Sequence, residues 1–287
     1  MIPRMNIIAW SAKAPWAEMR QVEQDLIISR ALVELFTEPM LSREVRFRGG
    51  TALHKLHLSK PLRYSEDIDL VRTAAGPIGP LIDRIRQRLE PWLGPAAFEQ
   101  SKIAPKLYFR AQAEDGSAII KLKIEINTRE RKIFDPPQTI RYEIENPWFT
   151  GGADIATFSR EELLATKLRA LLQREKGRDL LDLFHALEAF KDLNAARIVE
   201  CFRLYLEDRG ASISRAQAER RMFAKLAVPR FVADVRPLLS PDEAEKLTDD
   251  TIRRAFSLVF DRLITAIPGA PWAKTGDMKK KFRIAQP

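Results

Sequence analysis

Three acidic residues carry the clearest sign of chemistry in this sequence: Asp67, Asp69 and Glu125. Asp67 and Asp69 are two residues apart in a short predicted strand, residues 67–71, so their side chains share one face. Glu125 lies on the polar side of the alternating stretch 117–127. If these two strands are neighbours, three carboxylates meet on one patch of sheet. Their mutual repulsion then requires neutralising cations.

The residue types favour magnesium or manganese as those cations. Carboxylate oxygens suit Mg²⁺ and Mn²⁺. A single cysteine, Cys201, excludes a disulfide framework and a cysteine zinc site, and the presence of only three histidines argues against a histidine-built metal cage. Two such ions about 3.5–4 Å apart are typical of phosphoryl or nucleotidyl transfer.

A glycine pair supplies a possible phosphate-binding element. Gly49 and Gly50 permit close backbone approach, and a helix start after them offers free N–H groups to a phosphate. Thr51 adds a hydroxyl, and Arg48 and Arg63 are near enough in sequence to help hold a triphosphate.

Each of these pieces has a plainer interpretation when it is taken alone. A glycine pair is commonly a turn, and a D-x-D pair is commonly a solvated strand end. Glu125 is most simply an outer-face residue paired with Lys121 or Lys123. The order of glycine pair, helix, D-x-D strand and later acidic strand is much more specific than any one of them.

The elements that must position these residues follow from hydrophobic spacing and turn signals. Helices are predicted over 15–37, 51–58 and 81–89, and strands over 44–47, 67–71, 106–111, 117–127, 138–143 and 154–158. Ser159 and Glu162 form a capping-box pattern, and residues 159–267 read as helical throughout. The sequence pattern changes between Gly151-Gly152 and Ser159, from mixed strands and helices to helices alone. We therefore expect an α+β protein, with a first domain over 1–158 and a helical domain over 159–287. Residues 1–15 read as a loose leader, and the basic tail from about 268 reads as loose.

One lysine in the helical region stands out. Lys167 falls between Leu163 and Leu171 on the helical wheel, inside the apolar arc, where a charge is costly without an anion or a cleft. Arg174 lies on nearly the same line. The alternative is that Lys167 extends past its neighbours to water. Asp179 and Asp182 could cap a helix or pair with Arg178.

Four motifs together resemble a known family. The run from Phe47 to Val71 contains a GGTAL loop and an R-x-S-x-D-x-D strand, whose matching residues are Gly49 to Leu53, Arg63, Ser65, Asp67 and Asp69. KIEI at 123–126 is similar to the next acidic strand motif, and residues 166–183 resemble a helical K…R…RD-x-x-D motif. The order is that of the AbiEii/AbiGii-type toxin family, in the nucleotidyltransferase superfamily. The resemblance covers about residues 40–190. Gly50 departs from it, because the wider superfamily often has serine there.

This resemblance implies a fold and a set of roles. The fold would be a mixed nucleotidyltransferase-type sheet with flanking helices, followed by an α-helical domain that completes the cleft. Asp67, Asp69 and Glu125 would be catalytic and would bind Mg²⁺ or Mn²⁺. Lys167 would contact the triphosphate, and Asp182 would orient the base, the ribose or Lys167. The remaining residues expected to bind the NTP are Gly49, Gly50, Thr51, Arg63, Ser65 and Arg174.

The implied activity is transfer of NMP from an NTP to an RNA 3′ end, with tRNA as the expected acceptor. The protein would then be a growth-inhibiting toxin of a toxin–antitoxin or phage-defence system, opposed by a separate antitoxin protein. The net charge of +9 fits a polyanionic substrate. Two alternatives remain: transfer to a protein or small-molecule hydroxyl, and a non-catalytic nucleotide- or RNA-binding module. The absence of a long apolar run predicts a cytoplasmic protein with no membrane contact.

Overall fold

The computed structural model describes residues 2–101, 103–228 and 231–284, and its chain divides into two compact units, residues 1–159 and 160–287. The first unit combines helices with a mixed sheet, and the described part of the second is helical. The expected α+β class is therefore confirmed. None of the described helices is long and apolar enough to cross a membrane.

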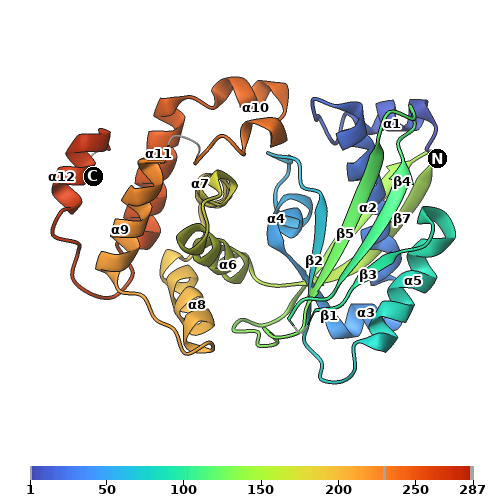
Figure 1. The fold of residues 1–287 in the computed structure, drawn as a ribbon, viewed down its shortest axis with the longest axis horizontal. Helices are drawn as coiled ribbons and strands as arrows, with labels where there is room; N and C mark the ends of the chain where they lie inside the picture. Colours follow the sequence, from blue (N-terminus) through green and yellow to red (C-terminus); the bar gives the residue numbers. More distant parts are fainter. Residues whose placement is uncertain (1, 102, 229–230, 285–287) are drawn as a thin grey trace. The chain divides into compact units, whose positions relative to one another are not determined.

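The first unit is built around a seven-stranded sheet. Figure 1 draws its strands as arrows that lie side by side. The strands are β1 (Val45–Arg48), β2 (Asp67–Arg72), β3 (Ala97–Glu99), β4 (Lys106–Gln112), β5 (Ile119–Asn127), β6 (Gln138–Asn146) and β7 (Phe149–Thr157). Their order across the sheet is β3-β4-β5-β2-β1-β7-β6. The pairs β2–β5 and β1–β7 are parallel, and the other neighbours are antiparallel. The two strands that carry the acidic residues are therefore central neighbours.

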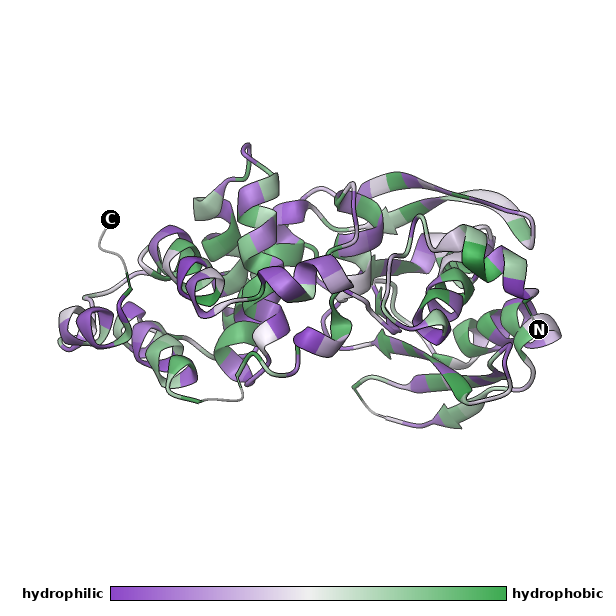
Figure 2. Ribbon diagram, turned by 90° about the horizontal axis from the view of Figure 1, so that it is seen from above, coloured by the Kyte–Doolittle hydropathy of each residue, from purple (hydrophilic) through white to green (hydrophobic). Residues whose placement is uncertain are grey.

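Alternation along the central strands separates a core face from a polar face. In β5, Ile120, Leu122, Ile124 and Ile126 are all buried, and the lysines and the glutamate between them lie on the other side. Figure 2 shows the same alternation as hydrophobic and hydrophilic bands along strands and helices. The polar positions thus face away from the core.

Helices of the first unit pack against this core. They are α1 (Arg4–Trp10), α2 (Met19–Phe36), α3 (Pro39–Glu44), α4 (Gly49–Ala52) with a π-helical turn (Leu53–His57), and α5 (Gly79–Leu93). α2 contacts β5, β6 and β7, and its apolar residues, including Leu26, Ile28 and Leu32, are fully buried. Gln24 of α2 donates its amide N–H groups to the backbone carbonyls of Glu66 and Lys121, just before β2 and within β5. This side chain ties together the two strands that carry the carboxylates.

The second unit consists of helices in its described part. They are α6 (Arg160–Gln173), α7 (Gly177–Ala189), α8 (Ala195–Glu207), α9 (Arg215–Leu226), a 3₁₀ turn (Arg236–Leu238), α10 (Pro241–Lys246), α11 (Asp249–Val259) with a π-helical turn (Phe260–Ile264), and α12 (Thr275–Phe282). α6 packs against α7 and α8, and α7 packs against α11. Tyr205 of α8 donates a 2.7 Å hydrogen bond to the buried Glu162 of α6, which ties these two helices together.

The expectation of a loose leader over residues 1–15 is wrong. Residues 4–10 form α1, and Trp10 and Trp16 are buried. Both indole N–H groups donate to the carboxylate of Asp25 on α2. Large aromatic side chains with a buried acceptor anchor this segment, although its sequence is too short to show a clear helical period.

The expectation of a loose tail from residue 268 is also wrong over its described part. α12 ends in Phe282, whose ring stacks on Phe223 of α9 at 6.3 Å between centroids. Phe223 also contacts Trp272, and Ile284 is buried. Residues 285–287 lie outside the described residues. Apolar side chains spaced through a basic segment thus hold the tail in place.

The glycine pair at 151–152 does not form a linker between the domains. Gly151 and Gly152 lie inside β7 and pair with Ile144 and Glu143 of β6. A side chain at Gly152 would come within 2.7 Å of the Arg141 guanidinium, so the glycine makes room for that residue on the neighbouring strand.

Candidate active site

Asp67, Asp69 and Glu125 lie on one face of the sheet. The parallel register of β2 and β5 sets Asp67 opposite Lys123 and Asp69 opposite Glu125. Residues that are opposite in register share a face, so the carboxylates gather as the alternation predicted, and we call these three residues the carboxylate face. Within the described residues, the side chain of Asp69 makes no hydrogen bond or ion pair, so no protein cation or donor occupies its carboxylate.

Lys123 lies among these carboxylates. Its Nζ is 2.9 Å from Asp67 Oδ2 and 3.5 Å from Glu125 Oε2. Burial raises the pKa of Asp67, the nearby charges of Asp69 and Glu66 raise it further, and Lys123 opposes the rise. Burial alone would lower the pKa of Lys123, but the carboxylates of Asp67 and Glu125 outweigh burial and raise it. The ammonium is therefore held in its charged form at the centre of the carboxylate face.

The carboxylate face is not a ready-made metal cage. Among the residues that the structure describes, no three His, Cys, Asp or Glu side chains are grouped so that they could hold a metal ion as they stand. Lys123 lies between Asp67 and Glu125, so these side chains would have to rearrange to bind a metal, and their role as metal ligands stays a prediction. The donor set still fits a hard divalent cation, since it consists of carboxylate oxygens on neighbouring strands, one of them unpaired.

The glycine segment lies directly against Asp69. Gly49 has a φ of +84°, and a Cβ at this position would be 2.2 Å from Asp69 Oδ2. Only glycine combines this backbone conformation with so close an approach. Gly49 and Gly50 begin α4, so their amides belong to the first turn of a helix, as the sequence indicated.

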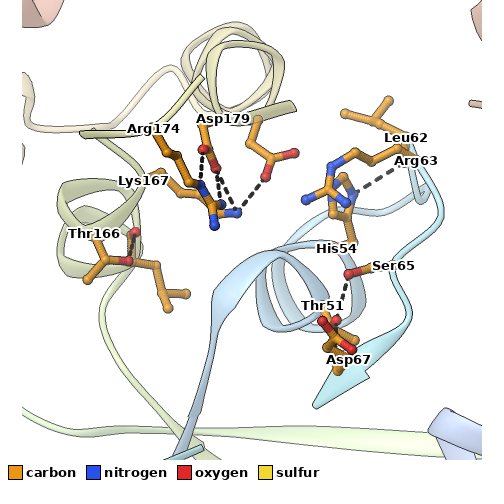
Figure 3. Close-up of polar contacts among 12 residues, drawn as sticks. Thr51, His54, Leu62, Arg63, Ser65, Asp67, Thr166, Lys167, Arg174 and Asp179 are labelled. Carbon is orange, nitrogen blue, oxygen red and sulfur yellow. Dashed lines mark hydrogen bonds and ion pairs between the residues drawn. The ribbon is translucent and has the colours of Figure 1, made fainter. Parts of the chain in front are cut away.

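Thr51 and Ser65 fasten this helix to β2. The Thr51 hydroxyl donates to the backbone carbonyl of Asp67 at 2.5 Å, and it lies 2.7 Å from the Ser65 hydroxyl (Figure 3). Because Thr51 has already donated its hydrogen, Ser65 must be the donor of the second bond. Thr51 is 2% exposed. In this structure the Thr51 hydroxyl positions the glycine segment beside Asp67, and a contact of Thr51 with phosphate stays a prediction.

The two arginines expected at the triphosphate are engaged elsewhere. Arg63 is buried, and its guanidinium donates to the backbone carbonyl of Tyr64 at 3.0 Å. Arg48 forms a 2.7 Å ion pair with the buried carboxylate of Glu130. This structure gives neither of them a solvent-facing guanidinium poised for phosphate.

The helical unit contains a second charged cluster, which we call the lysine cluster: Lys167, Arg174, Asp179 and Asp182. Lys167 Nζ is 2.8 Å from Asp182 and 3.6 Å from Asp179. Arg174 forms two bonds to Asp179, at 2.7 and 2.8 Å (Figure 3). Lys167, Asp179 and Asp182 are almost fully buried.

These contacts decide between the interpretations of the lysine cluster. Lys167 does not extend to water, because Asp182 holds its ammonium inside the unit. The role of Asp182 in orienting the base, the ribose or Lys167 stays a prediction. The guanidinium of Arg174, a residue expected to bind the NTP, forms a bidentate ion pair with Asp179 in this structure.

The helical unit also contains a cavity of about 530 Å³ between α6, α8, α9 and residues 211–213. Its lining includes the cationic side chains of Arg169, Arg221 and Lys225, together with apolar residues such as Phe202. Lys225 Nζ donates to the backbone carbonyl of Arg174 at 2.7 Å. The cavity therefore adjoins the end of α6, next to Arg174 of the lysine cluster.

A model of the AbiEii nucleotidyl transferase toxin family, of type IV toxin–antitoxin systems, matches residues 30–264. The chain belongs to this AbiEii family. Membership makes it a nucleotidyltransferase toxin by descent, and it implies an NTP substrate and an antitoxin partner. No curated protein matches the chain.

Solved structures share the AbiEii-type fold at low sequence identity. MenT4, the nucleotidyltransferase toxin Rv2826c of Mycobacterium tuberculosis H37Rv, is 15% identical, with a TM-score of 0.61 over 100% of both chains. JHP933 of Helicobacter pylori is also 15% identical, with a TM-score of 0.51 over 93% of this chain and 96% of its own. At this identity the likeness shows the fold alone.

Sequence reasoning about this AbiEii protein missed the role of Lys123. The residue was considered only as a surface partner of Glu125. Its contact with Asp67 depends on β2 and β5 being parallel and in that register, which the alternation of either strand does not reveal. The available signal was its place two residues before Glu125, on the same face of the strand.

Proposed function

We propose that this protein transfers a nucleoside monophosphate from an NTP to the 3′ end of an RNA, with the acceptor end of tRNA as the expected target. The observation that carries the proposal is the gathering of Asp67, Asp69 and Glu125 on one face of the sheet, directly beside Gly49. Membership in the AbiEii family supports nucleotidyl transfer. In a cell, modification of tRNA would inhibit translation and growth until an antitoxin opposes it, in a toxin–antitoxin or phage-defence setting.

Each part of the chain has a distinct task in this proposal. The backbone amides at the start of α4 bind phosphate oxygens, because a first helical turn offers N–H groups without partners in the helix. Asp67, Asp69 and Glu125 would hold Mg²⁺ or Mn²⁺. When bound, such cations neutralise phosphate oxygens and align the attacking and leaving groups. Glu125 helps to remove the proton from the attacking hydroxyl.

The reaction forms one bond to phosphorus and breaks another. The oxygen of the acceptor hydroxyl forms a bond to the α-phosphorus of the NTP, and the bond from the α-phosphorus to the bridging oxygen breaks. Pyrophosphate leaves, and the acceptor gains one nucleotide. The protein's contribution is position and charge, which is the usual source of rate enhancement in this class of reaction.

An excess of positive charge supports a polyanionic acceptor. The second unit has 25 basic and 19 acidic residues, whereas the first has 23 and 20. Three basic side chains line the cavity between α6, α8 and α9. RNA binding should therefore weaken steeply as salt is added, because each neutralised phosphate releases a counterion.

One labelling experiment tests the choice of acceptor. The protein is incubated with Mg²⁺, total RNA, total cell protein and each of the four α-labelled NTPs in turn. We expect label in the tRNA fraction, removable by an enzyme that digests RNA from the 3′ end. Label in protein or in a small molecule would contradict an RNA acceptor, and NTP or RNA binding without any label would indicate a non-catalytic module.

Lys167 is predicted to contact the triphosphate, and replacing it should weaken NTP binding. In Lys167→Met the loss of the ammonium should raise the Kd for NTP by about tenfold or more. The same change removes the Lys167 ammonium from its 2.8 Å contact with the buried Asp182, and breaking a buried ion pair costs about 3–5 kcal/mol of stability. NTP binding by calorimetry and thermal unfolding should therefore be measured together.

The double variant Lys167→Met with Asp182→Asn separates the two effects. Removing both charges should recover much of the lost stability, because no buried charge is left unpaired. NTP affinity should stay low if Lys167 contacts the triphosphate. Recovery of affinity together with stability would show that Lys167 is only half of a structural ion pair.

A further inference from the structure

Lys123 places a positive charge among the acidic side chains of the carboxylate face. The register places Lys123 between positions that hold acidic side chains: Asp67 lies opposite it on β2, and Glu125 follows it by two residues on β5. Its Nζ contacts both carboxylates, at 2.9 and 3.5 Å. The Lys123 side chain is only 26% exposed, so water screens these contacts incompletely.

The other cations on this face of the sheet have partners elsewhere. Arg48, opposite Asp69 in register, pairs with Glu130, and Lys106, opposite Glu125, pairs with Glu99 at 2.7 Å. Lys121 lies over the ring of Tyr108, with Nζ 4.3 Å from the centroid. Among the described residues, Lys123 is thus the cation in direct contact with the carboxylate face.

We propose that Lys123 is the resident counter-ion of the metal site: its ammonium holds Asp67 and Glu125 while no metal is bound, and a divalent cation must displace it to reach the same oxygens. The inference rests on the proposed metal-binding role of the carboxylate face. It also accounts for the absence of a preformed cage among the described acidic side chains.

Two opposite consequences follow from the same contact. Without metal, the ammonium offsets the repulsion among three carboxylates and stabilises the fold. With metal, the ammonium competes for Asp67 and Glu125 oxygens and lowers the affinity of the site. Lys123 therefore sets the metal concentration at which the site fills, and it keeps the protein folded below that concentration.

The test measures binding of Mn²⁺ alone, by electron paramagnetic resonance of the free ion, together with thermal unfolding in the absence of metal. Lys123→Met keeps the aliphatic stem and removes the charge. We expect its Mn²⁺ affinity to rise by about fivefold or more, and its metal-free Tm to fall below that of the wild-type protein. Added Mn²⁺ should raise the Tm of this variant more than that of the wild type.

Lys121→Met is the matched control. Lys121 is on the same strand and the same face, two residues away, and the substitution changes the net charge equally. Lys121→Met changes the electrostatic potential at the carboxylate face but removes no ammonium that contacts Asp67 or Glu125. The Mn²⁺ affinity of this variant should therefore stay close to the wild-type value. Lys123→Arg keeps the positive charge beside the carboxylates, so its Mn²⁺ affinity should not rise.

The Mn²⁺ affinities report separately on the role of Lys123 and on the metal site. Equal Mn²⁺ affinity in wild type, Lys123→Met and Lys121→Met would overturn the counter-ion role and leave the metal site standing. A decrease in Lys123→Met would overturn it as well. Failure of the wild-type protein and all variants to bind Mn²⁺ would overturn the metal site itself, and the inference with it.

Discussion

Asp69→Asn is expected to reduce nucleotidyl transfer by about a thousandfold or more while leaving the fold intact. Asp69 is one of the proposed metal ligands, and its side chain has no hydrogen bond or ion pair within the described residues. The amide has nearly the same shape but no charge, so it cannot neutralise a divalent cation. The change is measured as label transferred from an α-labelled NTP, with thermal unfolding recorded in parallel.

Glu66→Gln is the control for this substitution. Glu66 is exposed, lies one residue before β2, and adds to the local negative charge that raises the pKa of Asp67. Removing its charge should leave transfer within about twofold of wild type, because it is not a proposed ligand. Normal transfer by Asp69→Asn, or equal losses in the two variants, would contradict a specific role for Asp69.

Gly49→Ala is expected to lower both stability and transfer. A φ of +84° is costly for alanine, by about 1–2 kcal/mol, and the added Cβ would lie 2.2 Å from Asp69 Oδ2. Asp69 must move to make room, and a displaced catalytic group costs about a hundredfold in rate. Transfer and unfolding should be measured on the same preparation.

Gly116→Ala separates the strain from the displacement. Gly116 has a φ of +72°, but a Cβ there meets nothing within 4 Å. This variant should lose a similar amount of stability and keep its transfer activity. If both glycine variants lose activity alike, or neither does, the contact between Gly49 and Asp69 has no part in the reaction.

Much of the fold could be predicted from local sequence patterns, such as apolar–polar alternation and the positions of glycines. The alternation through residues 117–127 predicted β5 and its polar face, and the strand predicted over 106–111 is β4, its antiparallel neighbour. The run from Gly49 to Asp69 predicted a glycine-led helix followed by a strand. These features depend on neighbours along the chain, so a single sequence is enough to find them.

Other features depend on contacts between distant residues. Trp10 and Trp16 anchor the first helix through Asp25, and Phe282 fastens the tail to Phe223. Neither pairing has a local signal. In the same way, the hydrogen bond from the Thr51 hydroxyl to the backbone carbonyl of Asp67 depends on how the glycine segment packs against β2. Residue type indicates what a side chain can bind, whereas its burial decides what it does bind.

The carboxylate face could be predicted as a set, but not as an arrangement. Strand periodicity placed Asp67 with Asp69 and Glu125 on the polar side of its strand. Which strands are neighbours, and in what register, depends on packing across the whole sheet. The position of Lys123 between Asp67 and Glu125 is a consequence of that register alone.

The central claim is that Asp67, Asp69 and Glu125 bind divalent cations beside the glycine segment. Its most direct test is a crystal of the protein soaked with Mn²⁺ and a non-hydrolysable NTP, with the metal located by anomalous scattering. We predict manganese about 2.1 Å from oxygens of Asp67 and Asp69, with the Lys123 ammonium withdrawn. Manganese bound elsewhere, or Lys123 still between Asp67 and Glu125 with the NTP in place, would contradict the account.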